Sequence, residues 1–236
     1  MELTASIVLP ARIDPPAVTA LVAALDAALR GPARVVVLTG ASPDVFCHGL
    51  AIDTASDGAA ATAAFADLFV ALHRAPKPLL AAVDGAAIGG GLGLACACDW
   101  VVATDRATFG LPELLWGLVP AIIWPAITDR MAPHVARAWT ISAHTRTAAE
   151  AQPAGLVDDL VPAGALDGAV RRGARTLSRL EPRALVRLRA WARDSRALPL
   201  ADAVAEGARI TGAMMIEPHV QARWRAFAEG EVPWSA

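Results

Sequence analysis

Two apolar patterns alternate along the N-terminal part of the chain. Short runs rich in apolar residues predict β-strands, and they span 4–10, 33–40, 79–85 and 100–104. Between these runs, apolar residues recur at helical spacing over 14–31 and 59–75. The first of these helices is expected to begin at an Asp14 cap and to stop at Gly31. Because strands that alternate with helices are joined by parallel crossovers, the pattern predicts an α/β fold.

Segment 41–58, before the second helix, is expected to be a loop. The pattern changes after about Pro162, where the strand signal stops. Beyond Pro162, three segments carry apolar residues at helical spacing, and they span 164–180, 181–195 and 200–216. We therefore expect two parts, an α/β core over residues 1–165 and a helical C-terminal region over residues 166–236.

Composition narrows the class of protein. Hydrophobic residues make up 55% of the 236 positions, which is enough to bury a large core. The net charge of −2 gives no reason to expect a nucleic-acid partner. Cys47, Cys96 and Cys98 are an odd number without a C-x-x-C pair, so we expect no disulfide framework. No His or Cys spacing fits a metal site, and we expect none.

Membrane association is not expected. The longest apolar stretches contain Gly, Pro or Asp and are too short to cross a bilayer. Met1 is not followed by a basic region and an apolar run, the pattern of a secretory signal. We therefore expect a soluble, cytoplasmic protein.

Glycines gather where a strand is expected to pass into a helix, in the segment "DGAAIGGGLGLACACD" over 84–99. Glycines there leave the unpaired N–H groups of a helix start open to a ligand oxygen, which favours an anion or oxyanion site. Close packing of the helix on the strand would also require small residues, and the glycines alone leave both readings open. The spacing does not fit a dinucleotide-binding fingerprint.

A second glycine-containing loop and a glutamate favour the oxyanion site over close packing alone. "DVFCHGLAID" also follows a buried strand, with Gly49 ahead of an expected helix. "FGLPELLWGLVP" carries Glu113. Two such loops followed by a carboxylate indicate a polarising site with an acid beside it. A glutamate placed at a helix start for its dipole is the structural alternative for Glu113.

Three segments together resemble the enoyl-CoA hydratase/isomerase family, which has the crotonase fold. They are "PDVFCHGL", "PKPLLAAVDGAAIGGGLGLACACDWVVATDRATFGLPELLWGLVP" and "TAAEAQPAGLVDDLVP". The resemblance implies repeated ββα turns with C-terminal helices that form a homotrimer, or a hexamer of paired trimers. It also implies that the Leu50 and Gly90 N–H groups form an oxyanion hole for a thioester. No cofactor is expected beyond the phosphopantetheine arm of coenzyme A or an acyl carrier protein.

The departures from the family pattern bear on the chemistry. Hydratases of the family usually carry two glutamates, and the first of these positions is Gly93 here, whereas the second is Glu113. One carboxylate can still remove an α-proton or protonate a departing hydroxyl. In place of a glycine-rich "PGxGG" segment, this chain has "VPAIIWPA", and its C-terminal tail contains no lysine.

These departures resemble the small dehydratases of polyketide β-branching cassettes. The resemblance implies dehydration of a 3-hydroxy-3-methylglutaryl group on an acyl carrier protein to the 3-methylglutaconyl thioester. A decarboxylase or double-bond isomerase acting on a similar thioester is the alternative enzyme. The missing first glutamate also leaves open a catalytically silent subunit that binds the carrier protein.

Further side chains near these motifs are candidates for substrate binding. His48 lies in the first loop and could bind a substrate carboxylate or hydroxyl, or face solvent. Trp116 and Trp124 flank the glutamate segment and could line an acyl pocket or pack in the core. Arginines are frequent after residue 170, where they form a solvated face or a surface for an acidic carrier protein. They are Arg171, Arg172, Arg175, Arg179, Arg183, Arg187 and Arg189.

Overall fold

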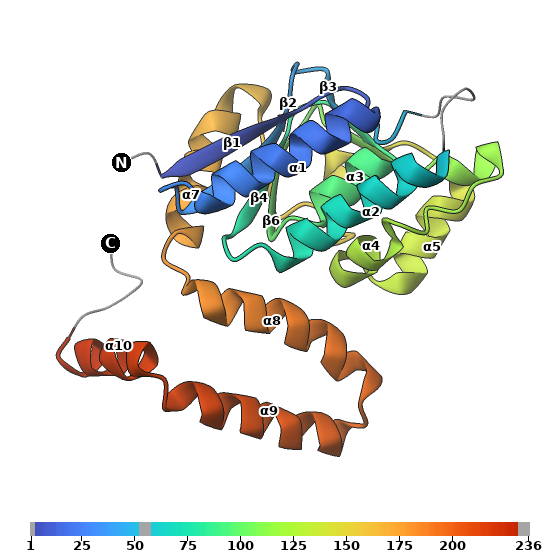
Figure 1. Cartoon of the computed structure of the whole chain (residues 1–236). Helices are drawn as coiled ribbons and strands as arrows, with labels where there is room; N and C mark the ends of the chain where they lie inside the picture. Colours follow the sequence, from blue (N-terminus) through green and yellow to red (C-terminus); the bar gives the residue numbers. More distant parts are fainter. Residues whose placement is uncertain (1–2, 52–57, 231–236) are drawn as a thin grey trace. The chain divides into compact units, whose positions relative to one another are not determined.

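The computed structural model describes residues 3–51 and 58–230 (Figure 1). Part of the expected loop and the end of the tail therefore lie outside the described residues. The chain forms two compact units, Met1–Leu185 and Val186–Ala236. No helix in the described part of the chain has both the length and the apolarity needed to span a membrane.

A five-stranded parallel sheet forms the centre of the first unit (Figure 1). Its strands, in spatial order, are β1 (Thr4–Leu9), β2 (Val35–Gly40), β4 (Leu79–Val83), β6 (Trp100–Thr104) and β9 (Asp159–Val161). Every neighbouring pair is parallel. The α/β prediction is thus confirmed, and four of these strands coincide with the predicted apolar runs.

A second, smaller sheet completes the repeat. Its strands are β3 (Val45–Cys47), β5 (Ala86–Ile88), β7 (Thr108–Gly110) and β8 (Arg146–Thr147), in that order. The first three each follow a strand of the large sheet, and β3 and β5 lead to helices, which gives the expected ββα turn. β3 falls within the segment expected to be a loop. Runs of three residues are too short to show a strand period, so the pattern does not reveal them.

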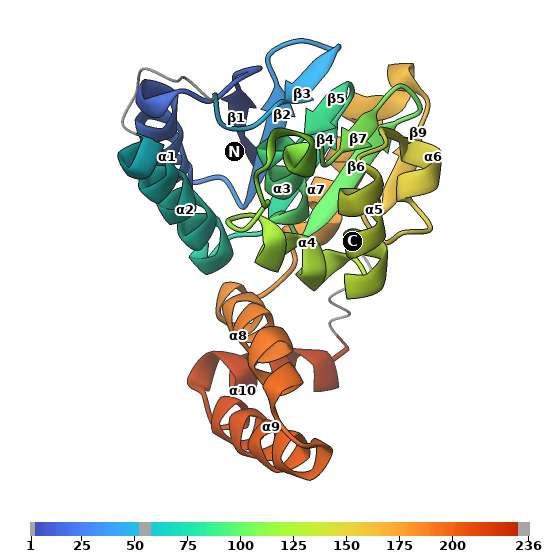
Figure 2. The ribbon, with the colours of Figure 1, turned by 90° about the vertical axis from the view of Figure 1, so that its right-hand side faces the viewer.

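Helices cover both faces of the large sheet. Alternate strand residues point to opposite faces, and Val36 and Leu38 belong to the larger core cluster, whereas Val35 and Val37 belong to a second one. The larger cluster includes residues of α1 (Pro15–Arg30), α2 (Gly58–Arg74) and α3 (Gly90–Cys96), as Figure 2 allows the reader to follow. The second includes residues of α7 (Leu166–Leu177). Because α7 packs on the sheet, the first compact unit continues beyond the expected boundary at residue 165.

Both ends of α1 are capped. The Asp14 carboxylate accepts a hydrogen bond from Ala17 N at 2.8 Å, as the sequence predicts. At the other end, Lys77 Nζ donates to the carbonyls of Ala28 and Gly31, at 2.9 and 2.7 Å. Lys77 is the only lysine of the chain, and its ammonium group therefore serves the helix C-terminus, where positive charge is favourable.

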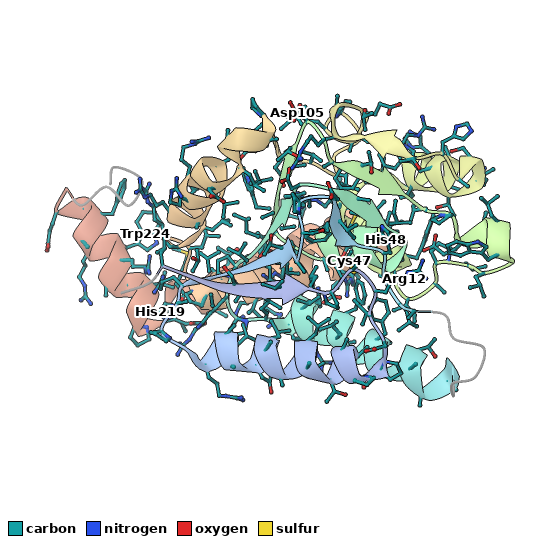
Figure 3. All side chains as sticks on the ribbon, turned by 90° about the horizontal axis from the view of Figure 1, so that it is seen from above. Arg12, Cys47, His48, Asp105, His219 and Trp224 are labelled. Carbon is teal, nitrogen blue, oxygen red and sulfur yellow. The ribbon has the colours of Figure 1, made fainter. Side chains whose placement is uncertain are left out.

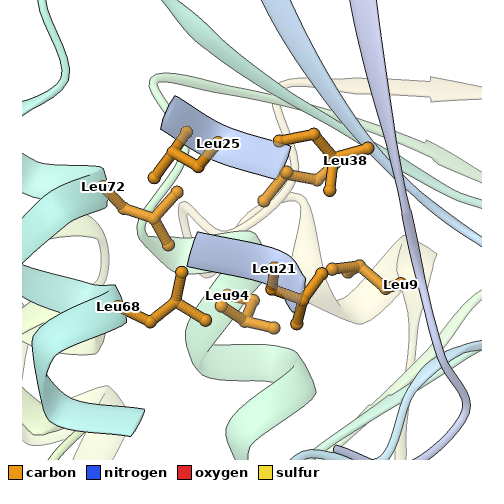
Figure 4. A pocket seen from close by; sticks show the side chains of 8 residues that line it. Leu9, Leu21, Leu25, Leu38, Leu68, Leu72 and Leu94 are labelled. Atoms are coloured by element: carbon orange, nitrogen blue, oxygen red, sulfur yellow. The ribbon is translucent and has the colours of Figure 1, made fainter. Parts of the chain in front are cut away.

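Leucines from α1, α2, α3 and the sheet enclose a small apolar void of about 10 Å³ (Figure 4). Leu21 and Leu25 come from α1, Leu68 and Leu72 from α2, and Leu94 from α3. A space of this size has room for one water at most, and an apolar lining gives that water no partners. We therefore regard the void as a packing gap in the core.

The remaining elements of the first unit follow β7 and lead to α7. They are η1 (Glu113–Trp116), α4 (Trp124–Arg130), α5 (Pro133–Ser142), α6 (Ala148–Ala151) and η2 (Ala163–Ala165). Helix α8 (Pro182–Asp194) begins in the first unit and continues into the second. The second unit also contains η3 (Ser195–Ala197), α9 (Leu200–Met215) and α10 (Pro218–Ala228). Neither α9 nor α10 has a buried residue, and Leu200 and Ile216 are 82% and 79% exposed.

Candidate active site

A cavity of about 340 Å³ lies in the first unit. Its wall combines the loop from His48 to Ala51, the start of α3 and the segment that runs from Glu113 to Ile123. Residues of α2, among them Phe65, complete the lining. The two glycine-containing loops and the glutamate that the sequence singles out therefore meet at one cavity.

The first loop is held on one side by the segment before α1 (Figure 3). Ile13 N donates to Gly49 O at 2.9 Å, and Ala51 N donates to Ile13 O at 2.8 Å. In such a parallel bridge the residue between the two partners, Leu50, turns its own N–H away from the neighbouring segment. Among the described residues, nothing accepts a hydrogen bond from Leu50 N.

Cys47 holds the same loop from within. Its Sγ accepts a hydrogen bond from Gly49 N at 3.2 Å, and burial raises the pKa of the thiol to about 11. Gly49 adopts a φ of +77°, in the left-handed region that favours glycine. The Gly49–Leu50 peptide is therefore fixed by contacts on both sides of it.

The glycine triplet brings the start of α3 into close contact with the first loop. Gly89 has a φ of +55°, and Gly90 is the first residue of α3. A Cβ on Gly91 would lie 1.8 Å from Cys47 O, so close packing requires that glycine. A Cβ on Gly90 would lie 3.0 Å from Gly49 Cα, which places the two loops in direct contact. In the described part of the chain, Gly90 N has no hydrogen-bond acceptor, as expected for a helix start.

Glu113 brings a carboxylate to this junction. It is half-buried, and a Cβ on Gly89 would lie 2.9 Å from its Oε1. Its Oε2 is buried and has no hydrogen-bond partner among the described residues. Burial raises the pKa of this carboxyl group, partly opposed by the residue's own backbone N–H. A raised pKa makes the carboxylate a stronger base than an exposed glutamate.

The other predicted side chains divide between cavity and core. His48 and Trp116 line the cavity, and Trp116 is 61% exposed. Trp124 is not among the lining residues but is half-buried against the main core cluster. Phe65 and Ile123 line the cavity, although the sequence did not single them out, because each occupies an ordinary apolar position.

The arginines of α7 lie away from the cavity. Arg171, Arg172 and Arg175 are exposed on a helix that covers the opposite face of the large sheet from α2 and α3. A different arginine is closer to the site. Arg12 is exposed and stands between two residues that hydrogen-bond to the His48–Ala51 loop, and Figure 3 shows it near His48.

The cavity is thus lined by two residues whose backbone N–H groups have no acceptor among the described residues, and by one carboxylate. Among the described lining residues, Glu113 is the only one with a carboxyl side chain and His48 the only one with an imidazole. Within residues 3–51 and 58–230, no three His, Cys, Asp or Glu side chains form a group that could hold a metal ion. The arrangement suits a substrate whose carbonyl oxygen gains negative charge while a proton moves nearby.

Comparison of the sequence with known proteins identifies relatives of this chain. The enoyl-CoA hydratase/isomerase family profile matches residues 12–235. A carnitinyl-CoA dehydratase of Salmonella arizonae is 34% identical over 176 residues, which cover 69% of this chain and 64% of that protein. The corresponding enzyme of Escherichia coli K12 is 32% identical over 183 residues, covering 72% and 67%. The match thus spans about two thirds of the length of these relatives.

Solved structures share the fold over nearly the whole chain. An enoyl-CoA hydrotase/isomerase family protein from Silicibacter pomeroyi has a TM-score of 0.80 at 26% identity, covering 92% of this chain and 97% of that one. An enoyl-CoA hydratase from Shewanella pealeana has a TM-score of 0.87 at 23% identity, covering 99% and 93%. The expected crotonase fold is thereby confirmed. The chain belongs to the enoyl-CoA hydratase/isomerase family.

Proposed function

We propose that this protein is a hydro-lyase that removes water from a 3-hydroxyacyl thioester. The observation that carries the proposal is the buried Glu113 carboxylate oxygen, which has no partner among the described residues, at a cavity that is also lined by Leu50 and Gly90, whose N–H groups have no acceptor there. A buried polar atom without a partner costs stability, which argues for a role that a substrate completes. The names of the dehydratase relatives support the same reaction class.

In the proposed reaction the thioester carbonyl oxygen accepts hydrogen bonds from Leu50 N–H and Gly90 N–H. These donors stabilise the enolate-like charge that develops when Glu113 removes the proton from C2. The C2 electron pair then forms the C2=C3 double bond as the C3–O bond breaks. Glu113 returns its proton to the departing hydroxyl, water leaves, and the carboxylate is regenerated. One carboxylate is sufficient for this cycle.

We further propose the substrate to be a 3-hydroxy-3-methylglutaryl group on an acyl carrier protein, with the 3-methylglutaconyl thioester as product. Support comes from the resemblance to the dehydratases of β-branching cassettes and from the scarcity of lysine. Lys77, the only lysine of the chain, is engaged at the end of α1. A carrier protein lacks the 3′-phosphate of coenzyme A and so requires fewer cations. The α7 arginines do not line the cavity, so carrier contacts near the cavity mouth would involve other residues, such as Arg12.

The C-terminal region is proposed to build a homotrimer, or a hexamer of paired trimers. Its helices α9 and α10, and the turn between them, expose large apolar side chains, among them Leu200, Ile216 and Trp224. Burying apolar surface of this kind against another copy would be favourable.

The test is a comparison of thioesters. A panel of 3-hydroxyacyl groups, including 3-hydroxy-3-methylglutaryl, is presented on coenzyme A and on a carrier protein, and product mass is followed. Loss of water supports the hydro-lyase. Loss of carbon dioxide, or a shifted double bond in an unsaturated substrate, would replace it with the decarboxylase or isomerase. No turnover of any thioester, with binding to the carrier protein retained, would favour the silent subunit. Equal kcat/KM on both carriers would overturn the carrier-protein assignment alone.

A further inference from the structure

Gly93 and Ile123 form an unusually close contact between α3 and the start of α4. A Cβ on Gly93 would lie 2.5 Å from Ile123 Cγ2 and 2.6 Å from Ile123 Cβ. It would also lie 3.2 Å from Phe69 Cζ. Any side chain at position 93 therefore collides with an isoleucine that packs directly on the backbone of α3.

Ile123 cannot easily move out of the way. It is 3% exposed and belongs to the main core cluster. Because isoleucine is branched at Cβ, its χ1 angle is restricted. Both its Cβ and its Cγ2 stand within 2.6 Å of the added atom, so a rotation about χ1 would move only one of them away. A smaller residue at position 123 would remove the Cγ2 contact, and relief of the Cβ contact would require a movement of the backbone.

The same isoleucine is part of the cavity wall. Ile123 lines the cavity together with Ile122 and Phe65. Gly93 lies one turn along α3 from Gly89, to which it is joined by the Gly93 N to Gly89 O hydrogen bond of 3.0 Å. Gly89 in turn adjoins the Glu113 carboxylate. The contact therefore places hydrocarbon close to the point where the proposed reaction takes place.

We propose that Ile123 is a specificity-determining residue whose side chain, seated against Gly93, limits the acyl pocket to short acyl groups. The inference rests on the proposed function, since it concerns the acyl part of the same thioester. Gly93 is required because Ile123 occupies the space that a side chain there would fill. The pair also keeps that part of the wall apolar, so no second carboxylate can reach the substrate from position 93.

Four variants test this pair: Gly93→Ala, Ile123→Ala, the double variant, and Ile127→Ala as a matched control. Ile127 is fully buried in α4 but is not a cavity-lining residue. Thermal unfolding of each is measured first. Gly93→Ala is expected to lower Tm, and Ile123→Ala to lower it as well. In the double variant the closer contact, to Ile123 Cγ2, is removed although the Cβ at position 123 remains, so its loss of Tm should be smaller than the sum of the two single losses.

Specificity is then measured with 3-hydroxyacyl thioesters of increasing chain length. For Ile123→Ala, the ratio of kcat/KM for long over short acyl chains should rise at least tenfold, whereas Ile127→Ala should keep the wild-type ratio. The inference is overturned if Ile123→Ala and Ile127→Ala show the same length preference. It is also overturned if adding Ile123→Ala to Gly93→Ala lowers Tm by as much as Ile123→Ala lowers it in the wild type.

Binding of saturated acyl-CoA thioesters, measured by calorimetry, separates this inference from the proposed reaction. If the wild type turns over no thioester, the hydro-lyase proposal fails, but affinity against chain length still reports the depth of the pocket. Tighter binding of long chains to Ile123→Ala than to the wild type would support the inference. An unchanged length dependence of affinity would contradict it.

Discussion

Glu113 and Glu150 occupy similar places in the chain and have opposite surroundings. Each stands in the first turn of a short helical segment, η1 for Glu113 and α6 for Glu150. Glu150 forms a capping box in which its Oε2 accepts from Thr147 N at 2.9 Å and from Thr147 Oγ1 at 3.0 Å. Glu113 leaves its Oε2 buried without a partner in the described part of the chain.

The pKa values of the two carboxyl groups are consequently shifted in opposite directions. The hydrogen bond from the Thr147 backbone is the main cause that lowers the pKa of Glu150. Burial is the main cause that raises the pKa of Glu113. A carboxylate that stabilises a helix is satisfied by its own chain, whereas one that moves protons is left for a substrate to satisfy. A glutamate at a helix start can thus belong to either class, and its partners decide which.

The largest expected effect comes from removing the charge of the unpartnered carboxylate. Glu113→Gln should lower kcat/KM by about 10²–10⁴-fold, the range for a lost general acid–base group. Glu150→Gln is the matched control and should leave kcat/KM near the wild-type value, because its carboxylate lies in a capping box and not in the cavity wall. Steady-state kinetics with the best thioester of the panel measures both. Similar losses in the two variants would remove the distinction drawn between them.

A smaller loss is expected from disturbing the donor beside Glu113. Gly90→Ala would place a methyl group 2.8 Å from Phe65 Cζ and 3.0 Å from Gly49 Cα, displacing one N–H donor. Loss of one oxyanion donor typically costs about 10²–10³-fold in kcat. Gly164→Ala is the control, since a Cβ there meets nothing within 4 Å. Wild-type kcat in the Gly90 variant, with its fold intact by circular dichroism, would exclude Gly90 from the oxyanion hole.

The pH dependence of activity should reflect the raised pKa of Glu113. The residue must be ionised to accept a proton, so kcat/KM should fall on the acidic side with a midpoint above the ordinary glutamate value of about 4.3. The profile is measured between the acid limit of stability and neutral pH. A midpoint at or below the ordinary value would assign that limb to another group.

Stability should respond oppositely at the two glutamates. Because the folded-state pKa of Glu113 is raised, its ionised form disfavours folding above that pKa, and the penalty disappears below the unfolded-state value. Glu113→Gln should therefore raise the free energy of unfolding at pH 7, and this gain should vanish on acidification. Because the folded-state pKa of Glu150 is lowered, Glu150→Gln should reduce stability at pH 7, and this loss should shrink as the pH falls through the lowered pKa. Denaturant unfolding at pH 7 and at acidic pH measures these changes. Stability changes of the same sign in the two variants at pH 7 would contradict the comparison.

Much of the fold follows from the apolar pattern, and the part that does not has a physical reason. The runs that contain β2, β4 and β6 are buried on both faces, which gives a strong signal. The strands β3, β5 and β7 have three residues each, too few for a period. Glu113 itself begins the four-residue 3-10 turn η1, which is likewise too short to show a period.

The candidate site was predictable through motifs and less so through side chains that merely line it. The loops with Gly49 and Gly90 and the carboxylate of Glu113 meet as the motifs indicate. The sequence left Trp124 between lining a pocket and packing in the core; it packs against the core, and its neighbour Ile123 lines the cavity. Adjacent residues at the start of a helix face different directions, and a sequence without coordinates does not reveal which of the two turns inward.

Exchange of the C2 protons of a saturated acyl thioester with deuterated water tests the central claim most directly, because it reports proton removal without requiring a leaving group. The acyl group can be 3-methylglutaryl on coenzyme A or on a carrier protein, followed by NMR. The wild type and Glu150→Gln should catalyse exchange at similar rates, while Glu113→Gln should lose about 10²-fold or more. Exchange by Glu113→Gln at the wild-type rate would contradict the assignment of the unpartnered carboxylate as the proton acceptor.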